Sequence, residues 1–213
     1  MTRSPSLCGI ILAAGNSSRM GSDKSLLPWP PAPCSAKSLR GTFLGAHIAA
    51  LSPLCDLVIV VAGKNVDLIT PIVYSMGAFL VRNNSPELGQ FSSLKLGLQD
   101  VLNRGRDSAI VSLVDRPPVQ PATLAKLHQE YFAAIEEHLW GVVPECEGKH
   151  GHPYFAGRAL MEALLRAQLT TTARDIMHSV ASNLRYVPVD DPNVTLNINT
   201  PEDYAALPQV TSE

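Results

Sequence analysis

Short apolar runs rich in β-branched residues alternate with longer helical patterns along nearly the whole chain. One run, "DLVIVVA" at residues 56–62, continues without a polar residue after its aspartate, which is typical of a strand covered on both faces. Strands that alternate with helices in this way predict a mostly parallel sheet with helices on both faces. The expected fold class is therefore α/β, and ligands of such folds bind beyond the carboxyl ends of the strands.

The same pattern predicts the remaining elements. Further strands are expected at residues 7–13, 78–83, 108–114, 139–145 and 184–189. Helices are expected at residues 39–51, 66–75, 92–103, 121–137, 158–167 and 172–182. The stretch "PWPPAPCSAKS" predicts irregular surface structure, and "NINTPEDYAAL" closes the chain. Because no repeat or low-complexity segment divides the 213 residues, we expect a single domain over residues 1–213.

Composition excludes several classes of function. The chain is 46% hydrophobic and 17% charged, with a formal net charge of -2 and a pI of about 6.3. Such a balance favours neither nucleic acid nor a membrane as partner, so an anion site must be local. We expect no signal peptide and no bilayer-spanning stretch. The cysteines are scattered, which fits reduced thiols in a cytoplasmic protein better than disulfides or a zinc site: Cys8, Cys34, Cys55 and Cys146.

The first predicted strand ends in a cationic loop, "LAAGNSSRMGSDKSLL". Backbone N–H groups near Gly15 and Gly21 can form an anion-binding concavity. Arg19 adds a planar fork of donors and Lys24 adds a mobile charge, and both suit phosphate. The loop is not a Walker A motif, because Lys24 does not directly follow Gly21. The structural alternative is an ordinary strand–helix connection with solvated cations.

This loop resembles the motif L-A-[AG]-G-x-[SG]-x-R-[MF]-G-x-x-K-x-L of the α/β nucleotidyltransferases, and within them that of the molybdopterin nucleotidyltransferases. The matching residues are Leu12, Ala13, Ala14, Gly15, Arg19, Met20, Gly21 and Lys24. The resemblance implies a Rossmann-like, three-layer αβα fold. It also implies that residues 12–15 bind a nucleoside triphosphate and that Arg19 and Lys24 are catalytic groups on its phosphates.

Two further strand ends carry metal-binding residue types. "VDRPPV" places Asp115 directly after a predicted strand, where a carboxylate facing a triphosphate would hold Mg²⁺. A turn or N-cap aspartate is the alternative. In "NINTPEDY", residues 200–203 are explained as a helix cap, whereas Asn199 stands before it. The resemblance implies that Asp115, a third catalytic residue, and Asn199 are the Mg²⁺ ligands. Many relatives have Asp at the second position, so Asn199 would contribute less negative charge.

The segment "ELGQFSSLKLGL" resembles the family's G-x-x-x-S-L-x-x-G-L pattern, which lies beside the nucleotide base and sugar. Gly89, Gln90 and Ser93 are therefore expected to bind the nucleotide. The alternative is that Ser92 or Ser93 only caps the following helix. In the family, Ala-Ala in the first loop goes with cytidine enzymes and Ala-Gly or Gly-Gly more with guanosine enzymes. The pair at 13–14 therefore favours CTP.

The segment "GKHGHPYF" resembles the family's acceptor-side G-H-P motif. Its two histidines could instead suggest zinc, but no further ligand lies nearby in sequence. "TTTARDI" resembles the next acceptor-side loop, often G-x-x-x-A-R, with threonines in place of the glycine-rich start. We therefore expect His152, Pro153 and Arg174 to bind the acceptor. A solvated helix residue is the alternative for Arg174.

The resemblance, which runs from Gly9 to Tyr204, implies transfer of CMP from CTP to molybdopterin with release of pyrophosphate. Charge neutralisation and in-line positioning would drive this step without a covalent nucleophile. Residues 7–120 would form the nucleotide half and residues 121–207 the acceptor half. The alternatives are guanylyl transfer to the same cofactor, transfer to a sugar or polyol phosphate, and a nucleotide-binding accessory protein for a molybdoenzyme. A molybdoenzyme is also a candidate partner of the enzyme itself.

Overall fold

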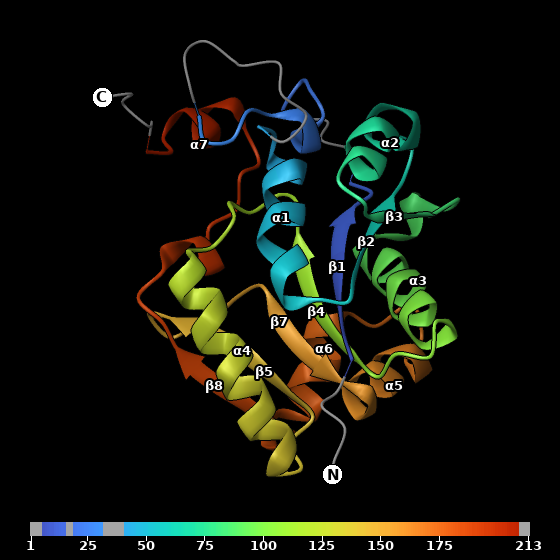
Figure 1. Cartoon of the computed structure of the whole chain (residues 1–213), viewed down its shortest axis with the longest axis vertical. Coiled ribbons are helices and arrows are strands. Elements are labelled where there is room, and N and C mark those ends of the chain that lie inside the picture. The colour runs from blue at the N-terminus through green and yellow to red at the C-terminus, as the bar shows by residue number, and fades with distance from the viewer. Residues whose placement is uncertain (1–5, 16–18, 32–40, 209–213) are drawn as a thin grey trace.

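The computed structural model describes residues 6–15, 19–31 and 41–208 (Figure 1). Within these ranges the strands form one eight-stranded sheet in the order β3-β2-β1-β4-β7-β5-β6, and β8 pairs with β5. The strands are β1 Leu7–Ala13, β2 Leu57–Ala62, β3 Phe79–Arg82, β4 Ser108–Leu113, β5 Gly141–Cys146, β6 Lys149–His150, β7 Tyr154–Gly157 and β8 Leu184–Pro188.

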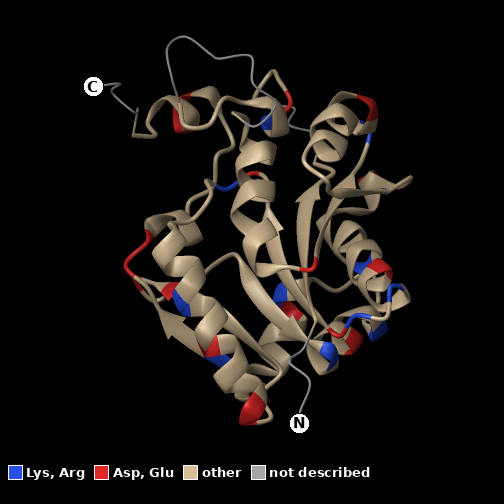
Figure 2. Ribbon diagram, in the orientation of Figure 1, with Lys and Arg blue, Asp and Glu red and all other residues tan. Residues whose placement is uncertain are grey.

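The first half of the sheet is parallel, as the sequence predicts. β1 lies between β2 and β4, so that Ile10 stands opposite Ile59 on one side and Val111 on the other. β3 continues the parallel arrangement next to β2. No charged residue occurs in β1, β2 or β4, and Figure 2 shows these strands free of acidic and basic colour. Their parallel arrangement places all their carboxyl ends at one edge of the sheet.

The second half contains two strands that the sequence pattern did not predict. β7 pairs antiparallel with both β4 and β5 and so joins the two halves of the sheet. β6 forms a hairpin with β5 through Glu147 and Gly148, which have φ angles of 51° and 73°. Two successive left-handed residues are typical of a tight two-residue hairpin turn. Strands of two and four residues are too short to show a periodicity of their own, which explains why they were missed.

The helices agree with the prediction except at some boundaries. They are α1 Phe43–Leu51, α2 Val66–Ser75, α3 Gln90–Asn103, α4 Pro121–Glu136, α5 Arg158–Arg166, α6 Ala173–Ser179 and α7 Pro201–Ala205. α1 begins at Phe43 because the Thr42 hydroxyl accepts from the N–H of Gly45 and caps it. The predicted start at residue 39 lies outside the described residues. α3 begins two residues before the predicted Ser92, so neither candidate serine is its N-cap.

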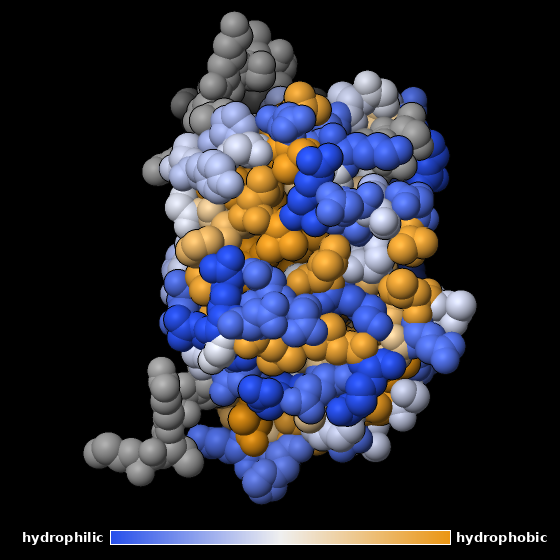
Figure 3. Space-filling view, turned by 90° about the vertical axis from the view of Figure 1, so that its right-hand side faces the viewer, coloured by the Kyte–Doolittle hydropathy of each residue, from blue (hydrophilic) through white to orange (hydrophobic). Residues whose placement is uncertain are grey.

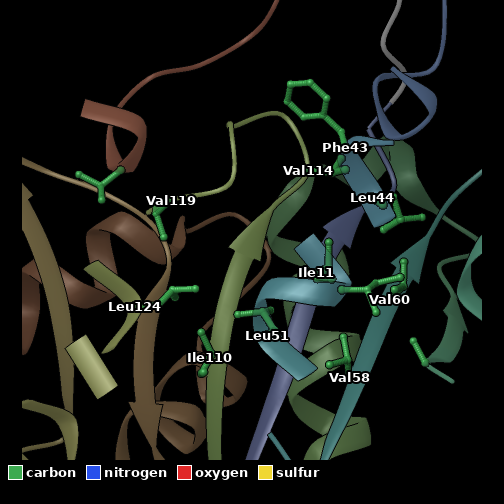
Figure 4. Packing of buried hydrophobic residues seen from close by; sticks show 14 of the residues in the cluster. Ile11, Phe43, Leu44, Leu51, Val58, Val60, Ile110, Val114, Val119 and Leu124 are labelled. Carbon is green, nitrogen blue, oxygen red and sulfur yellow. The ribbon is translucent and has the colours of Figure 1, made fainter. Parts of the chain in front are cut away.

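Two hydrophobic clusters define the layers. Leu7, Ile11 and Ala13 of β1 point into a cluster with the buried faces of α1, α2 and α4. The alternate residues Ile10 and Leu12 point into a second cluster with α3 and α5, against which α6 packs. Figure 4 shows the first cluster, with the labelled side chains of β1, β2 and β4 facing those of α1. The three-layer αβα, Rossmann-like arrangement is therefore confirmed, and burial of each large aliphatic side chain contributes about 1.5–3 kcal/mol to it.

Two large apolar side chains are exposed near one edge of the sheet. Phe79 of the edge strand β3 and Leu68 of α2 are exposed, and Figure 3 shows the side of the molecule on which these elements lie, with apolar residues between polar ones. Arg104 covers the Phe79 ring at 4.3 Å from its centroid. Among residues 6–15, 19–31 and 41–208, none of the helices combines the length and apolarity that crossing a bilayer requires. Cys8, Cys55 and Cys146 are free thiols, and Cys34 lies outside these ranges.

Candidate active site

Three segments that are distant in sequence meet at the carboxyl edge of the parallel strands. Val114 N donates to Leu12 O at 3.2 Å, which aligns the ends of β1 and β4. Ile198 N donates to Asp115 O at 2.8 Å, which attaches the segment before α7 to the end of β4. We call the group formed by Lys24, Asp115 and Asn199 the strand-end corner. Backbone hydrogen bonds of the sheet edge thus bring the segments of Asp115 and Asn199 together, and Lys24 joins them through its side-chain bond to Asn199.

Lys24 is the buried cation of the strand-end corner. It begins a short 3-10 helix that Asp23 caps by accepting from Ser25 N at 2.8 Å. Its side chain is 8% exposed, and Nζ donates to Asn199 Oδ1 at 3.0 Å. Burial lowers the pKa of Lys24, and the charge of Asp115 opposes that shift. The charge of Arg19, which is exposed in the preceding turn, also lowers the pKa of Lys24 by repulsion. The two residues predicted to bind phosphate are therefore close enough to interact.

Asp115 and Asn199 offer oxygen atoms to a cation. Asp115 Oδ1 is buried and has no hydrogen-bond partner within the described part of the chain. The backbone of Asn199 is fixed because its N–H donates to Asp203 Oδ2 at 2.8 Å, next to the capping box of α7. Its side-chain oxygen has a second lone pair besides the one that Lys24 uses. One carboxylate and one amide fit Mg²⁺, which commonly takes further oxygens from phosphates and water.

No group of three or more His, Cys, Asp or Glu residues suited to a metal occurs within residues 6–15, 19–31 and 41–208. His150, part of the segment with a zinc alternative, instead stacks on Tyr186 at 4.1 Å between ring centroids and lies 3.3 Å from a Glu145 carboxylate oxygen.

The loop after β1 is braced by a residue that sequence reasoning missed. Asn65 Nδ2 donates to Ala13 O at 2.9 Å, and Asn65 Oδ1 accepts from Gly63 N at 3.1 Å. This buried amide fixes the backbone of Ala13 and Ala14 against the end of β2. Gly15 is exposed, and a Cβ added there would meet no atom within 4 Å. The loop is thus held at Ala13 by Asn65, whereas at Gly15 there is space for a ligand to approach the protein backbone.

A cleft of about 820 Å³ opens beside the strand-end corner. Leu12, Gly89 and Gln90 line it from the predicted nucleotide half, and His152 and Arg174 line it from the predicted acceptor half. The lining also includes Arg116, Lys149, His150 and His178, but no Asp or Glu among the described residues. A cleft that gathers cations and histidines without any carboxylate is suited to anionic ligands.

The predicted base-side residues are arranged unequally. Gln90 is exposed at the first position of α3, and Gly89 precedes it as the N-cap. Ser93 is buried and accepts from Asn83 Nδ2 at 2.9 Å, and it is not among the described residues of the cleft lining. Ser92 Oγ donates to Gly89 O at 2.7 Å. The serines therefore hold the loop before α3, whereas Gly89 and Gln90 face the cleft.

His152 lies half-buried in the cleft wall. The backbone N–H of His152 donates to Val194 O at 2.8 Å. The preceding residue must be glycine, because a Cβ on Gly151 would lie 2.1 Å from that same oxygen. His152 Nδ1 is buried and unpartnered within the described residues. Burial, and secondly the charge of Arg116, lower the pKa of His152 to about 3. The imidazole is therefore neutral near pH 7, next to the buried Pro153.

Arg116 and His47 are functional candidates that the motif comparison passed over. Arg116 occupies the middle of Asp115-Arg116-Pro117, and its Nη1 donates to Val194 O at 2.6 Å. The buried His47 donates from Nε2 to Arg116 O at 2.9 Å and accepts from Ser112 at Nδ1 at 3.0 Å. Burial lowers the pKa of His47 to about 4. A histidine on a predicted helix carries no motif signal, whereas Arg116 was visible in the sequence directly after a predicted metal ligand.

Arg174 is exposed in the first turn of α6, whose start is capped by Thr172 and Asp175. Its guanidinium is free to turn toward the cleft that it lines. The structure thus separates the predicted residues into two neighbouring regions. Lys24, Asp115 and Asn199 form the strand-end corner, and Gln90, His152 and Arg174 border the cleft.

The parallel sheet, the braced loop after β1 and the carboxylate at the end of β4 define an α/β nucleotidyltransferase. The sequence model of the MobA-like NTP transferase domain matches residues 9–187. The chain therefore belongs to that family and is an enzyme.

Curated relatives agree with this class over most of their length. The probable molybdenum cofactor guanylyltransferase of Mycobacterium avium is 27% identical over 212 residues, which cover 98% of each chain. The molybdenum cofactor cytidylyltransferase of Escherichia coli is 24% identical over 92% of each chain. Six of the relatives found carry a guanylyltransferase name and one carries a cytidylyltransferase name.

Solved structures share the fold. The crystal structure of Rv0371c from Mycobacterium tuberculosis superposes with a TM-score of 0.73 at 25% identity, covering 94% of this chain and 96% of that one. A structure of Rv0371c in complex with manganese superposes with a TM-score of 0.71 at 24% identity, over the same shares of the two chains.

Proposed function

We propose that this enzyme transfers a nucleotidyl group from a nucleoside triphosphate to molybdopterin, with release of pyrophosphate. The observation that carries the proposal is the meeting of the loop after β1, Asp115 and Asn199 at one strand edge. The cleft beside them is lined by cations and by no carboxylate among the described residues. That arrangement can hold two anions side by side, which the reaction needs. The names of the curated relatives support molybdopterin over a sugar or polyol phosphate as the acceptor.

The chain's own groups have distinct tasks in this proposal. Residues 12–15 with Gly89 and Gln90 bind and align the nucleotide, and the buried Ser93, expected from the motif to bind it too, supports the loop before α3 through Asn83. Lys24 and Arg19 stabilise the charge that develops on the leaving pyrophosphate. His152, Pro153 and Arg174 hold the acceptor so that its phosphate approaches the α-phosphate in line. Residues 7–120 thus serve as the nucleotide half and residues 121–207 as the acceptor half.

Asp115 and Asn199 are the proposed ligands of a divalent cation, with Mg²⁺ as the expected ion. When bound, the ion neutralises phosphate charge and orients the reacting oxygens. The buried and unpartnered Asp115 Oδ1 supports this assignment, because a carboxylate oxygen in that position costs free energy unless a partner completes it. Asn199 supports it through its fixed backbone and the free lone pair of its amide oxygen.

Two bases are candidates for the nucleotide. The pair Ala13-Ala14 favours CTP, because that pair goes with cytidine enzymes in the family. The names of most curated relatives favour GTP. We expect CTP on the residues of this chain. Thermal stabilisation by each nucleotide decides between them, since a ligand at a hundredfold excess over its dissociation constant adds on the order of 3 kcal/mol to the stability. A larger shift with GTP would replace the cytidylyl proposal by the guanylyl one.

The decisive assay measures pyrophosphate release with CTP, GTP, ATP and UTP, each combined with molybdopterin or with a sugar phosphate and Mg²⁺. The proposal expects turnover with molybdopterin and one preferred nucleotide. Turnover only with a sugar or polyol phosphate would move the enzyme to another acceptor class. Nucleotide binding without turnover on any acceptor would indicate an accessory protein. The expected setting is the cytoplasm, where a molybdoenzyme would receive the product.

A further inference from the structure

Arg116 holds a charged guanidinium in the cleft wall with few partners. Nη1 donates to Val194 O at 2.6 Å, whereas Nε is buried and has no hydrogen-bond partner within the described residues. The ion pairs found among those residues do not include Arg116. A guanidinium has five N–H donors and stays charged in proteins. Its charge is therefore held in the protein with donors still unused.

Such a group is costly to bury without an opposite charge. The acidic residue whose charge acts on Arg116 is its neighbour Asp115. In the proposed function, that carboxylate faces the divalent cation and the nucleotide phosphates. Arg116 would then lack a counter-charge when the cation is bound, unless a second anion approached from the cleft.

The surroundings of Arg116 fit such an anion. His152 Nδ1 and Tyr154 Oη are also buried and unpartnered within the described residues, and both residues line the same cleft as Arg116. The His152 and Tyr154 rings lie 5.2 Å apart, so these polar groups belong to one neighbourhood. Neutral imidazole and phenol groups can bond an anion without adding charge, and the guanidinium supplies the charge.

We propose that Arg116 binds the phosphate of the acceptor, with His152 and Tyr154 beside it. The inference rests on the proposed function and adds a substrate contact that the motif resemblance does not contain, because Arg116 occupies the x position of D-x-P. A planar guanidinium can donate two parallel hydrogen bonds to a phosphate monoester. Arg116 directly follows Asp115 in the chain. An acceptor phosphate bound by Arg116 would therefore lie next to nucleotide phosphates held at Asp115.

The test uses the full chain with its nucleotide subsite filled by an α,β-methylene triphosphate and Mg²⁺. Inorganic phosphate is then titrated at constant ionic strength while the thermal midpoint is recorded. In wild type, phosphate should raise the midpoint further. Arg116→Gln should weaken the apparent phosphate affinity about ten- to a hundredfold, which is typical for loss of a charge-assisted hydrogen bond. Arg116→Lys, which keeps the charge, should recover part of that affinity.

Arg158→Gln is the matched control. It removes an exposed charge at the start of α5, outside the cleft lining, and should leave phosphate affinity unchanged. An equal phosphate response in wild type and Arg116→Gln, or no response in wild type, would overturn the role of Arg116. A lower midpoint with unchanged phosphate affinity would show that Arg116 only braces Val194. Failure of the methylene nucleotide to stabilise wild type would instead contradict the proposed function itself.

Discussion

The strand-end corner and the cleft beside it differ in how far the protein completes them. In the corner, Lys24 is bonded to Asn199 and the backbone is tied to β1 and β4, while Asp115 Oδ1 is buried without a partner among the described residues. In the cleft wall, polar atoms of Arg116, His152 and Tyr154 lack partners within the described residues. A backbone held by hydrogen bonds is pre-organised, whereas buried polar groups without partners gain most when a ligand arrives. In the proposed function, the nucleotide and its cation would meet a held backbone with one open carboxylate oxygen, and the acceptor would meet a wall with several open polar groups.

The largest expected effect breaks the corner at its carboxylate. Asp115→Asn should keep the fold, because the residue's backbone bond to Ile198 is retained, and should lower turnover about a hundredfold or more as the cation loses its charged ligand. Turnover against Mg²⁺ concentration measures this, with circular dichroism as the check on folding. Asn199→Asp is the paired variant and should be tolerated or tighten Mg²⁺ binding. Unchanged Mg²⁺ dependence in both variants would reject the metal assignment.

The next effect separates the corner from the cleft. Lys24→Ala should weaken nucleotide binding about ten- to a hundredfold, the usual worth of a charge-assisted hydrogen bond. His152→Ala should leave nucleotide binding nearly unchanged and raise the KM for the acceptor, lower kcat, or both. Calorimetric titration of nucleotide and kinetics with varied acceptor measure the two effects. If His152→Ala weakened nucleotide binding as much as Lys24→Ala does, the acceptor would not lie where we place it.

Two glycines give a matched test of rigidity. Gly151→Ala should destabilise the protein by about 1–3 kcal/mol, because the added Cβ would lie 2.1 Å from Val194 O. That oxygen also accepts hydrogen bonds from His152 N and Arg116 Nη1. Gly15→Ala meets open space and should leave the free energy of unfolding nearly unchanged while weakening nucleotide binding. Urea unfolding and nucleotide titration of both variants check this. Equal stability losses would contradict the difference in local packing between Gly151 and Gly15.

The last prediction concerns pH. The pKa of His47 is lowered to about 4 and that of His152 to about 3, both chiefly by burial. As pH falls below about 6.5, the unfolded chain binds protons that the folded chain excludes, so stability present at neutral pH is lost toward pH 4. Each histidine contributes a slope of about 1.4 kcal/mol per pH unit. His47→Gln should remove one such slope, measured as urea unfolding free energy between pH 7 and pH 4.5. An unaltered slope in that variant would show that His47 does not contribute to the loss of stability at low pH.

The elements of the first half could be predicted because their signals are local. The apolar runs of β1, β2 and β4 are long enough to show burial on both faces, and longer helical patterns separate them in the sequence. β6 and β7 could not be predicted in the same way, because a two-residue and a four-residue strand exist only through pairing with β5 and β4. The start of α3 was also misplaced, since its N-cap is Gly89 and provides no side-chain signal.

The sequence by itself determined the α/β class, the family motifs and the identity of Lys24, Asp115, Asn199 and His152 as candidates, because each lies in a short pattern with its own chemistry. Only the tertiary structure decided which of them meet. Asn199 reaches Lys24 across 175 positions of chain because Ile198 pairs with the end of β4. Burial, too, is a property of the packed chain. It leaves Arg116 with unused donors and makes His152 neutral, and no pattern of neighbouring residues contains that information.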